Sequence, residues 1–164
     1  MIERLVYKFT RSPVGRLKLV ASDRGLVAIL WSTDEKTGRV SLSHAGKQDR
    51  HPILVAAEKQ LKEYFAGRRK RFSVKLDLRG TPFQKKVWRA LLKIPHGETR
   101  TYGEIARQLG HPNGARAVGA ANGKNPVSII APCHRLVGST GKLRGFAGGL
   151  KAKADLLKHE GARR

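Results

Sequence analysis

The 164-residue chain contains a single cysteine, Cys133. One cysteine excludes a disulfide within the chain and any zinc site that needs two thiolate ligands. Long apolar runs are missing as well. The longest, Leu26–Trp31, is far short of the ~20 residues that a membrane-spanning helix requires. Residues 1–4 lack the apolar stretch of a signal peptide, so we expect the protein to stay in the cytoplasm.

Acidic residues are scarce: 12 Asp and Glu stand against 34 Lys and Arg, giving a formal net charge of +22. No carboxylate occurs between Glu104 and Asp155. The bases in that interval are Arg107, Arg116, Lys124, Arg135, Lys142, Arg144, Lys151 and Lys153. A folded surface with bases and few acids is typical of phosphate binding, whereas charge that serves solubility mixes both signs. The composition therefore predicts a nucleic-acid partner, and no basic amphipathic helix favours a membrane.

The hydrophobic share of 40% is enough for a folded core. In residues 1–79 the alternation of apolar and polar residues predicts three strands, over 5–9, 17–21 and 26–31. A polar loop over 32–50 follows, then a helix behind Pro52 that ends at Gly67, and a fourth strand over 74–78. We expect this segment to form an N-terminal α/β domain.

Residues 80–164 have mainly helical signals and are expected to form a second domain. Thr81 with Pro82 begins one helix, which stops before Pro95. A capping box of Thr101 and Glu104 begins the next, through residue 109, and a turn leads to a short helix over 115–122. This pair is a helix-turn-helix candidate. The second helix is nearly all Ala and Gly around Arg116, which would let its backbone approach a partner closely.

Cys133 follows an apolar, strand-like segment and directly precedes His134. Pro132 restricts the backbone, so the thiol is predicted to lie at a defined turn. A thiolate is the reactive form of cysteine, and a nearby imidazole or Arg favours it. A small buried cysteine without any chemical role is the alternative that these residues alone leave open.

Longer motifs carry a family resemblance. They are Asn125-Pro126-Val127, Pro132-Cys133-His134-Arg135, residues 145–150 and 156–161, together with Thr81–Gln84, Val87-Trp88, Ile94-Pro95, Gly97–Thr99, Tyr102 and Arg116–Gly119. This set resembles the O6-alkylguanine-DNA alkyltransferases of bacterial type and covers residues 80–161 almost without gaps. The resemblance implies a ribonuclease-H-like first domain and a winged-helix-like second one. The activity that it implies is stoichiometric repair of O6-alkylguanine, and of O4-alkylthymine, by irreversible transfer of the alkyl group to Cys133.

The resemblance also implies residue roles. His134 would deprotonate Cys133 through a water, Glu160 would orient His134, and Asn125 would brace the turn. Double-stranded DNA would be bound through its minor groove, with the damaged base flipped out. The DNA contacts would be Tyr102, Arg116, Ala115, Ala117, Gly119 and Arg135, and the pocket for the base would be formed by Tyr102, Pro132, Leu136 and Phe146. No cofactor and no obligate protein partner is implied, although copies could assemble cooperatively on DNA.

Several positions depart from the family pattern. Phe146 stands where tyrosine is common, Ala131 replaces a larger aliphatic residue, and Ala147 offers no side-chain donor. The paired cysteines that hold zinc in human-type members are missing, so we expect no metal.

Three other functions deserve comparison. A helix-turn-helix regulator would need neither Cys133 nor Glu160, and a non-enzymatic lesion-binding relative would lack the cysteine. A cysteine hydrolase would turn over and would not need the acid-free stretch. The residues themselves also allow plain structural roles for Glu160, Asn125 and Tyr102, as a surface carboxylate, a turn residue and a packing residue.

Overall fold

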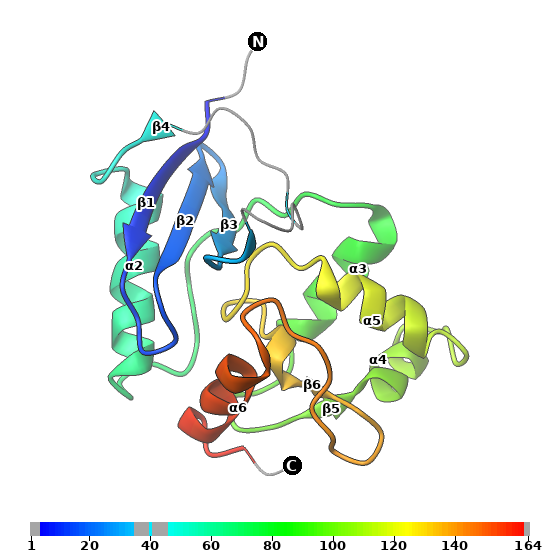
Figure 1. The fold of residues 1–164 in the computed structure, drawn as a ribbon. Coiled ribbons are helices and arrows are strands. Elements are labelled where there is room, and N and C mark those ends of the chain that lie inside the picture. The colour runs from blue at the N-terminus through cyan, green and yellow to red at the C-terminus, as the bar shows by residue number, and fades with distance from the viewer. Residues whose placement is uncertain (1–3, 35–39, 41–45, 163–164) are drawn as a thin grey trace. The chain divides into compact units, whose positions relative to one another are not determined.

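The computed structural model describes residues 4–34, 40 and 46–162. It divides into two compact units, Met1–Arg79 and Gly80–Arg164. The first contains a β-sheet with one long helix and the second is mainly helical, so the chain is α+β (Figure 1). Within the described ranges, no helix is both long and apolar enough to cross a membrane.

The sheet of the first unit has the strand order β3-β2-β1-β4. Strands β1 (Val6–Thr10), β2 (Leu17–Ser22) and β3 (Gly25–Leu30) form an antiparallel meander, which confirms the three predicted strands. Strand β4 (Gly46–Lys47) pairs in parallel with β1. It lies inside the segment predicted to be a loop, so that prediction is wrong at this point, while residues 35–39 and 41–45 lie outside the described part.

The strand predicted over residues 74–78 is also wrong. Only Leu76 forms a bridge, to Leu26, and it is flanked by two backbone hydrogen bonds of 2.8 Å from Leu26 N to Lys75 O and from Asp77 N to Leu26 O. In this segment Lys75 is exposed and the other four residues are half-buried. An alternation of apolar and charged residues in the sequence suits any extended segment at a surface, with or without a ladder of hydrogen bonds.

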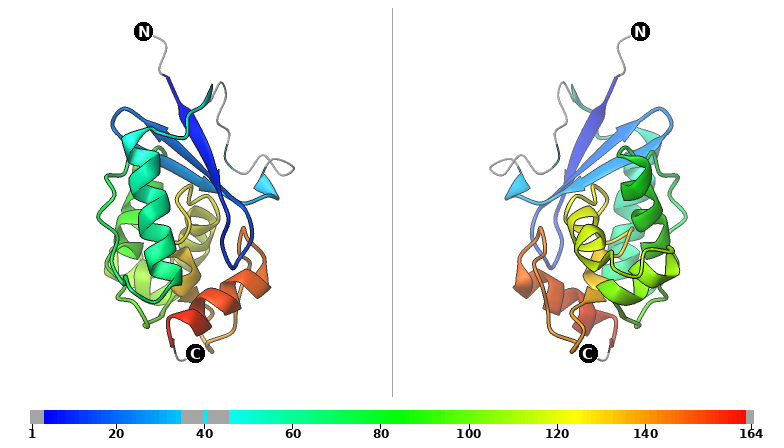
Figure 2. Two further views of the ribbon diagram at one scale, coloured as in Figure 1. Left: turned by 90° about the vertical axis from the view of Figure 1, so that its left-hand side faces the viewer. Right: turned by 90° about the vertical axis from the view of Figure 1, so that its right-hand side faces the viewer.

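Helix α2 (Pro52–Phe65) lies along one face of this sheet (Figure 2). Its buried residues Leu54, Ala57, Leu61 and Tyr64 follow the spacing that predicted the helix. His51 caps the first turn, because its Nδ1 accepts a hydrogen bond of 3.2 Å from Ile53 N.

The helices of the second unit begin where local signals place them. Both α3 (Pro82–Leu91) and α4 (Tyr102–Gln108) start with complete capping boxes, Thr81 with Gln84 and Thr101 with Glu104. Helix α5 (Ala115–Gly123) packs against both, and the indole Nε1 of Trp88 donates a 2.8 Å hydrogen bond to Ala121 O. The predicted pair of short helices is therefore present as α4 and α5.

The remaining elements of the second unit surround the cysteine. They are the two-stranded parallel pair β5 (Arg100–Thr101) and β6 (Leu136–Val137), the 3₁₀ turn η1 (Cys133–Arg135), and α6 (Leu150–His159). Helix α6 contacts η1. The unit thus places its last helix against the segment that carries the only thiol.

A crowded glycine tests the packing of the first unit. A Cβ at Gly25 would lie 2.7 Å from Lys75 O and 2.8 Å from Leu76 C, both backbone atoms. We predict that Gly25→Ala lowers the free energy of unfolding by about 1–3 kcal/mol, the usual cost of overpacking. Gly46→Ala is the matched control, since among the described residues no atom beyond its chain neighbours lies within 4 Å of its Cβ position. Denaturant melts that coincide for the two variants would contradict the tight packing of Gly25 against the backbone of Lys75 and Leu76.

Candidate active site

Cys133 begins η1 and is almost completely buried. Its Sγ lies 3.9 Å from Ser128 Oγ, to which the thiol donates a hydrogen bond. The preceding apolar segment is a turn rather than the strand-like segment expected, because Ala131 N bonds to Val127 O at 3.0 Å. Ile129 in this turn has φ = 77°, a left-handed conformation that is unusual for a β-branched residue. The sulfur therefore sits on a tight and strained turn.

Asn125 holds that turn together. Its Oδ1 accepts a hydrogen bond of 3.1 Å from Val127 N, and its Nδ2 donates one of 2.8 Å to Ala131 O. The side chain is fully buried. One amide therefore satisfies polar backbone groups at both ends of the turn, which would be costly to bury unpaired.

The two residues after Cys133 share one buried carboxylate. His134 Nε2 lies 2.9 Å from Glu160 Oε2. Arg135 donates to the same carboxylate through Nε, 2.8 Å from Oε1, and Nη2, 2.9 Å from Oε2. The side chains of His134 and Glu160 have no exposed surface, and that of Arg135 is 7% exposed. His134 and Arg135 thus form one buried cluster with Glu160, although Glu160 lies 26 and 25 positions away from them in the chain.

Burial lowers the pKa of His134, although its hydrogen bond with Glu160 acts in the opposite direction. The imidazole is therefore neutral at pH 7. The Glu160 carboxylate can only accept a hydrogen bond, so Nε2 carries the proton and Nδ1 has the lone pair. Nδ1 is buried and has no hydrogen-bond partner among the described residues. It is the atom able to receive a proton relayed from the thiol.

Arg135 requires a correction. It was expected among the DNA contacts, but it is buried, and its guanidinium is bound to Glu160 and to the carbonyl oxygen of Ile94. The fork of a guanidinium fits a carboxylate through two parallel hydrogen bonds. Because these partners occupy the guanidinium and leave little of the side chain exposed, Arg135 braces the active-site turn.

Lys153 and Asn122 are site residues that sequence reasoning missed. The Lys153 side chain is fully buried on α6, with Nζ 3.3 Å from Arg144 O and 5.9 Å from the centre of the Tyr102 ring. Burial lowers its pKa to about 8, and negative charge on Cys133 opposes that shift. Asn122 Nδ2 lies 3.5 Å from Cys133 O, and its buried Oδ1 has no partner in the described structure. Nothing in the sequence indicates that Lys153 is buried, because it lies among other lysines of the same helix.

An open cleft is lined by α4, α5 and the segment 138–145. Tyr102, Arg116, Ala115 and Gly119 line it. The other residues lining it are Thr101, Gly103, Glu104, Arg107, Asn122, Gly123, Gly138, Ser139, Arg144 and Gly145. Burial raises the pKa of Tyr102, so its phenol keeps its proton at neutral pH. The cleft combines a phenol, exposed bases and small residues.

The other residues expected at this site are more scattered. Ala117 lies on the exposed side of α5 together with Arg116. Pro132 and Leu136 are buried next to η1, and Phe146 is half-buried; none of the three lines the cleft. The structure thus brings Tyr102, Arg116, Ala115 and Gly119 together, with Cys133, His134, Glu160 and Asn125 forming a second, buried group.

Metal-binding side chains do not cluster here. In the described ranges no three His, Cys, Asp or Glu residues lie close enough together to hold a metal ion. What the arrangement can do chemically is deliver a thiolate, with proton transfer to a buried, oriented imidazole.

Comparison with known proteins places this geometry in a family. Residues 82–162 match the family model described as 6-O-methylguanine DNA methyltransferase, DNA binding domain, and residues 5–78 match the ribonuclease-like domain of the same enzyme. A methylated-DNA–protein-cysteine methyltransferase of Methanosarcina acetivorans is 46% identical over 96% of this chain and 99% of its own length. The enzyme of the same name from Mycobacterium bovis is 48% identical over 96% of this chain and 93% of its own.

Comparison with solved structures leads to the same family. The structure of Mycobacterium tuberculosis OGT in complex with DNA is similar with a TM-score of 0.86 and 46% identity, covering 94% of this chain and 92% of that one. The single thiol with its His–Glu pair and the matches to both family domains lead to the same conclusion: the chain belongs to the methylated-DNA–protein-cysteine methyltransferases, which repair DNA by alkyl transfer to a cysteine.

Proposed function

We propose that Sγ of Cys133 is the alkyl acceptor and that the substrate is O6-alkylguanine in double-stranded DNA. One observation carries this assignment: the only thiol of the chain begins the turn whose next residue, His134, is held by Glu160 through Nε2 and keeps Nδ1 available for a proton. O4-alkylthymine carries the same type of alkyl–oxygen bond and is included in the proposed substrate class.

The reaction is a displacement at a saturated carbon. His134 Nδ1 takes the thiol proton, through a water where no direct contact exists, and Glu160 stabilises the imidazolium that forms. The thiolate then forms a bond from sulfur to the alkyl carbon while the bond from that carbon to guanine O6 breaks. The phenol of Tyr102, which burial keeps protonated, is suited to stabilise the leaving base by a hydrogen bond or a proton. The thioether product is stable, so each molecule reacts once.

Access to the alkyl carbon requires that the nucleotide leave the base stack. We infer that α4 and α5 act as a helix-turn-helix and that α5 lies in the minor groove, where Ala115, Ala117 and Gly119 allow close approach. Arg116 is exposed and has no ion-pair partner within the described chain, so it suits insertion into the gap that the flipped base leaves. Cooperative assembly of several copies on DNA extends this proposal.

We propose that the two compact units are separate domains, residues 1–79 and 80–164. The proposed fold of the first is ribonuclease-H-like, because a meander of three strands is covered by α2. The proposed fold of the second is winged-helix-like, supported by α4, α5 and the β5–β6 pair. An enzyme that acts on chromosomal DNA works where that DNA is, which we take to be the cytoplasm.

Lys153 complements the charge of the thiolate. The second unit has four side-chain carboxylates, and each has another partner: Glu98 binds Arg100, Asp155 binds Lys151, Glu160 binds the His134–Arg135 pair, and Glu104 caps α4. A buried ammonium group needs a compensating anion. We infer that the Cys133 thiolate, formed when the thiol gives up its proton, is this anion, because negative charge on Cys133 opposes the lowering of the Lys153 pKa by burial.

The proposed reaction is tested by stoichiometry. With an excess of an oligonucleotide duplex containing O6-methylguanine, we expect one methyl group transferred per protein molecule and no later turnover. Peptide mass mapping should place the methyl group on the peptide that contains Cys133. Cys133→Ala should bind the duplex with unchanged affinity and transfer nothing. Multiple turnovers would support a hydrolase, and a methyl group on another residue would rule out the mechanism.

A variant of Arg116 distinguishes an effect on base flipping from an effect on alkyl transfer. We predict that Arg116→Ala slows repair of the duplex at least 10-fold and leaves the reaction with free O6-benzylguanine within 2-fold, because the free base needs no extrusion. Lys151→Ala is the matched control, an exposed base on α6 that pairs with Asp155. Equal losses on both substrates in Arg116→Ala would show that the arginine acts on the thiol site instead.

The buried lysine predicts a pH dependence of stability. With a pKa of about 8 in the folded protein against 10.5 in the unfolded chain, Lys153 binds more proton in the unfolded state between these values. The free energy of unfolding therefore gains up to roughly 3 kcal/mol as pH rises from 8 to 10.5. Lys153→Met should lack this gain, whereas Lys151→Met on the exposed side of α6 should keep it. Parallel stability curves for wild type and Lys153→Met would contradict the burial of a charge.

A further inference from the structure

The sheet face opposite α2 carries aromatic rings and cations that the alkyl-transfer reaction does not use. Lys8 of β1 points toward α2, because its Nζ lies 3.1 Å from Oε1 of Glu58. Successive side chains of a strand point to opposite faces. Its neighbours Tyr7 and Phe9 therefore lie on the other face, where both remain partly exposed.

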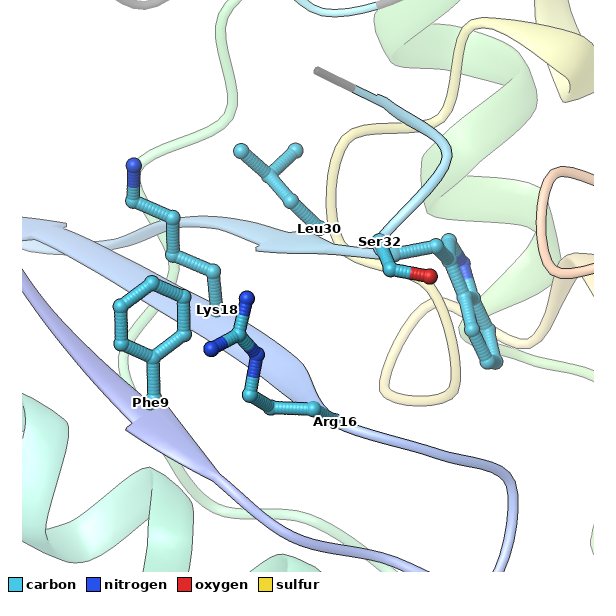
Figure 3. A pocket seen from close by; sticks show the side chains of 6 residues that line it. Phe9, Arg16, Lys18, Leu30 and Ser32 are labelled. Atoms are coloured by element: carbon cyan, nitrogen blue, oxygen red, sulfur yellow. The ribbon is translucent and has the colours of Figure 1, made fainter. Parts of the chain in front are cut away.

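Each of these rings is covered by a cation from the β2 side of the hairpin. The guanidinium carbon of Arg16 lies 4.2 Å from the centre of the Phe9 ring, and Lys18 Nζ lies 4.4 Å from the centre of the Tyr7 ring. Lys18 is also the strand partner of Phe9. Figure 3 shows the Arg16 guanidinium beside the Phe9 ring and next to the Lys18 chain. We call Tyr7, Phe9, Arg16 and Lys18 the cation–aromatic patch.

The two positive charges of this patch are not neutralised by the described carboxylates of the first unit. Five of these six carboxylates lie near other groups: Glu58 near Lys8 and Lys62, Glu63 near Arg69, Asp77 near Arg79, Asp34 near Trp31 N, and Asp23 at 3.8 Å from His51 Nε2. The sixth, Asp49, forms no ion pair with another described residue. No ion pair between described residues includes Arg16 or Lys18. A ring face attracts a cation but does not cancel its charge. Among the described residues the patch therefore carries net positive charge.

A shallow recess adjoins the two cations. Phe9, Arg16 and Lys18 line one part of it and Leu30, Trp31 and Ser32 line the rest (Figure 3). A phosphodiester fits this chemistry, because a guanidinium binds two of its oxygens side by side, an ammonium adds a third contact, and a hydroxyl can donate to the same group.

We propose that the cation–aromatic patch binds backbone phosphates of duplex DNA and gives the first unit its own contact with the substrate. The inference rests on the proposed function in that DNA is the substrate. The rings hold the charged groups of Arg16 and Lys18 in place before binding, which reduces the entropy lost on contact. Phosphate contacts fix position without reading sequence, so the patch adds affinity for any duplex and assigns a use to the positive charge of the first unit.

Paired double variants test this contact. Arg16→Ala/Lys18→Ala removes two positive charges from the patch, and Lys59→Ala/Lys62→Ala removes two exposed ones from α2, on the other face. We expect the patch variant to lose about 10-fold in affinity for an undamaged duplex at 0.1 M salt. Its log–log salt slope should fall by about 1.8, since each phosphate contact contributes about 0.9. The α2 variant should lose less than about 2-fold.

Three further readouts decide between explanations. Thermal melts and the reaction with free O6-benzylguanine should match wild type in both variants, which shows that fold and thiol site are intact. Equal loss of DNA affinity in both variants, or none in the patch variant, would overturn the proposal. A change in sedimentation of the patch variant without a change in DNA affinity would overturn it in favour of contact with another copy of the chain. Wild-type protein that binds DNA through the patch but transfers no alkyl group would refute the proposed function alone.

Discussion

The carboxylate of Glu160 is the group on which the thiol site depends. It accepts hydrogen bonds from both His134 and Arg135, and Arg135 also donates to the carbonyl of Ile94 in the turn that follows α3. Three stretches of chain are thereby joined around a single buried charge. Breaking a buried pair by removing one partner costs about 3–5 kcal/mol. The same contact that orients the imidazole also fixes the turn that begins with Cys133, so chemistry and folding of this unit rest on one interaction.

The cysteine turn adds a second constraint. Ile129 occupies a left-handed conformation, which costs a β-branched residue about 1–3 kcal/mol. The Asn125 amide, bonded to Val127 N and Ala131 O, and the burial of the Ile129 side chain hold it there. Strain of this kind persists only where the surroundings over-determine the backbone. A nucleophile on such a turn has few positions available to it, which suits a reaction that needs in-line approach.

Local sequence signals predicted those elements whose determinants are local. Capping boxes at Thr81 and Thr101 set the starts of two helices, and apolar spacing set α2. Strand β4 has only two residues, so periodicity could not reveal it. The contact of His134 with Glu160 spans 26 residues, and only the family resemblance joined them. Sequence analysis places Arg135 and Lys153 among the surface bases, because charged residues are mostly exposed. Their burial depends on partners that only the tertiary fold brings near them.

The inferred pairing of Lys153 with the thiolate distinguishes the alkylated protein from the unreacted one. Alkylation removes the ionisable thiol and with it the anion that could balance Lys153, while the ammonium group remains inside the same unit with every side-chain carboxylate there already occupied. Lys153 must then release its proton or stay buried as an uncompensated cation, and both states weaken the fold. A spent molecule thus differs from a fresh one in its internal electrostatics. Quality-control proteases that act on loosened chains could therefore clear used copies without any recognition of the alkyl group itself.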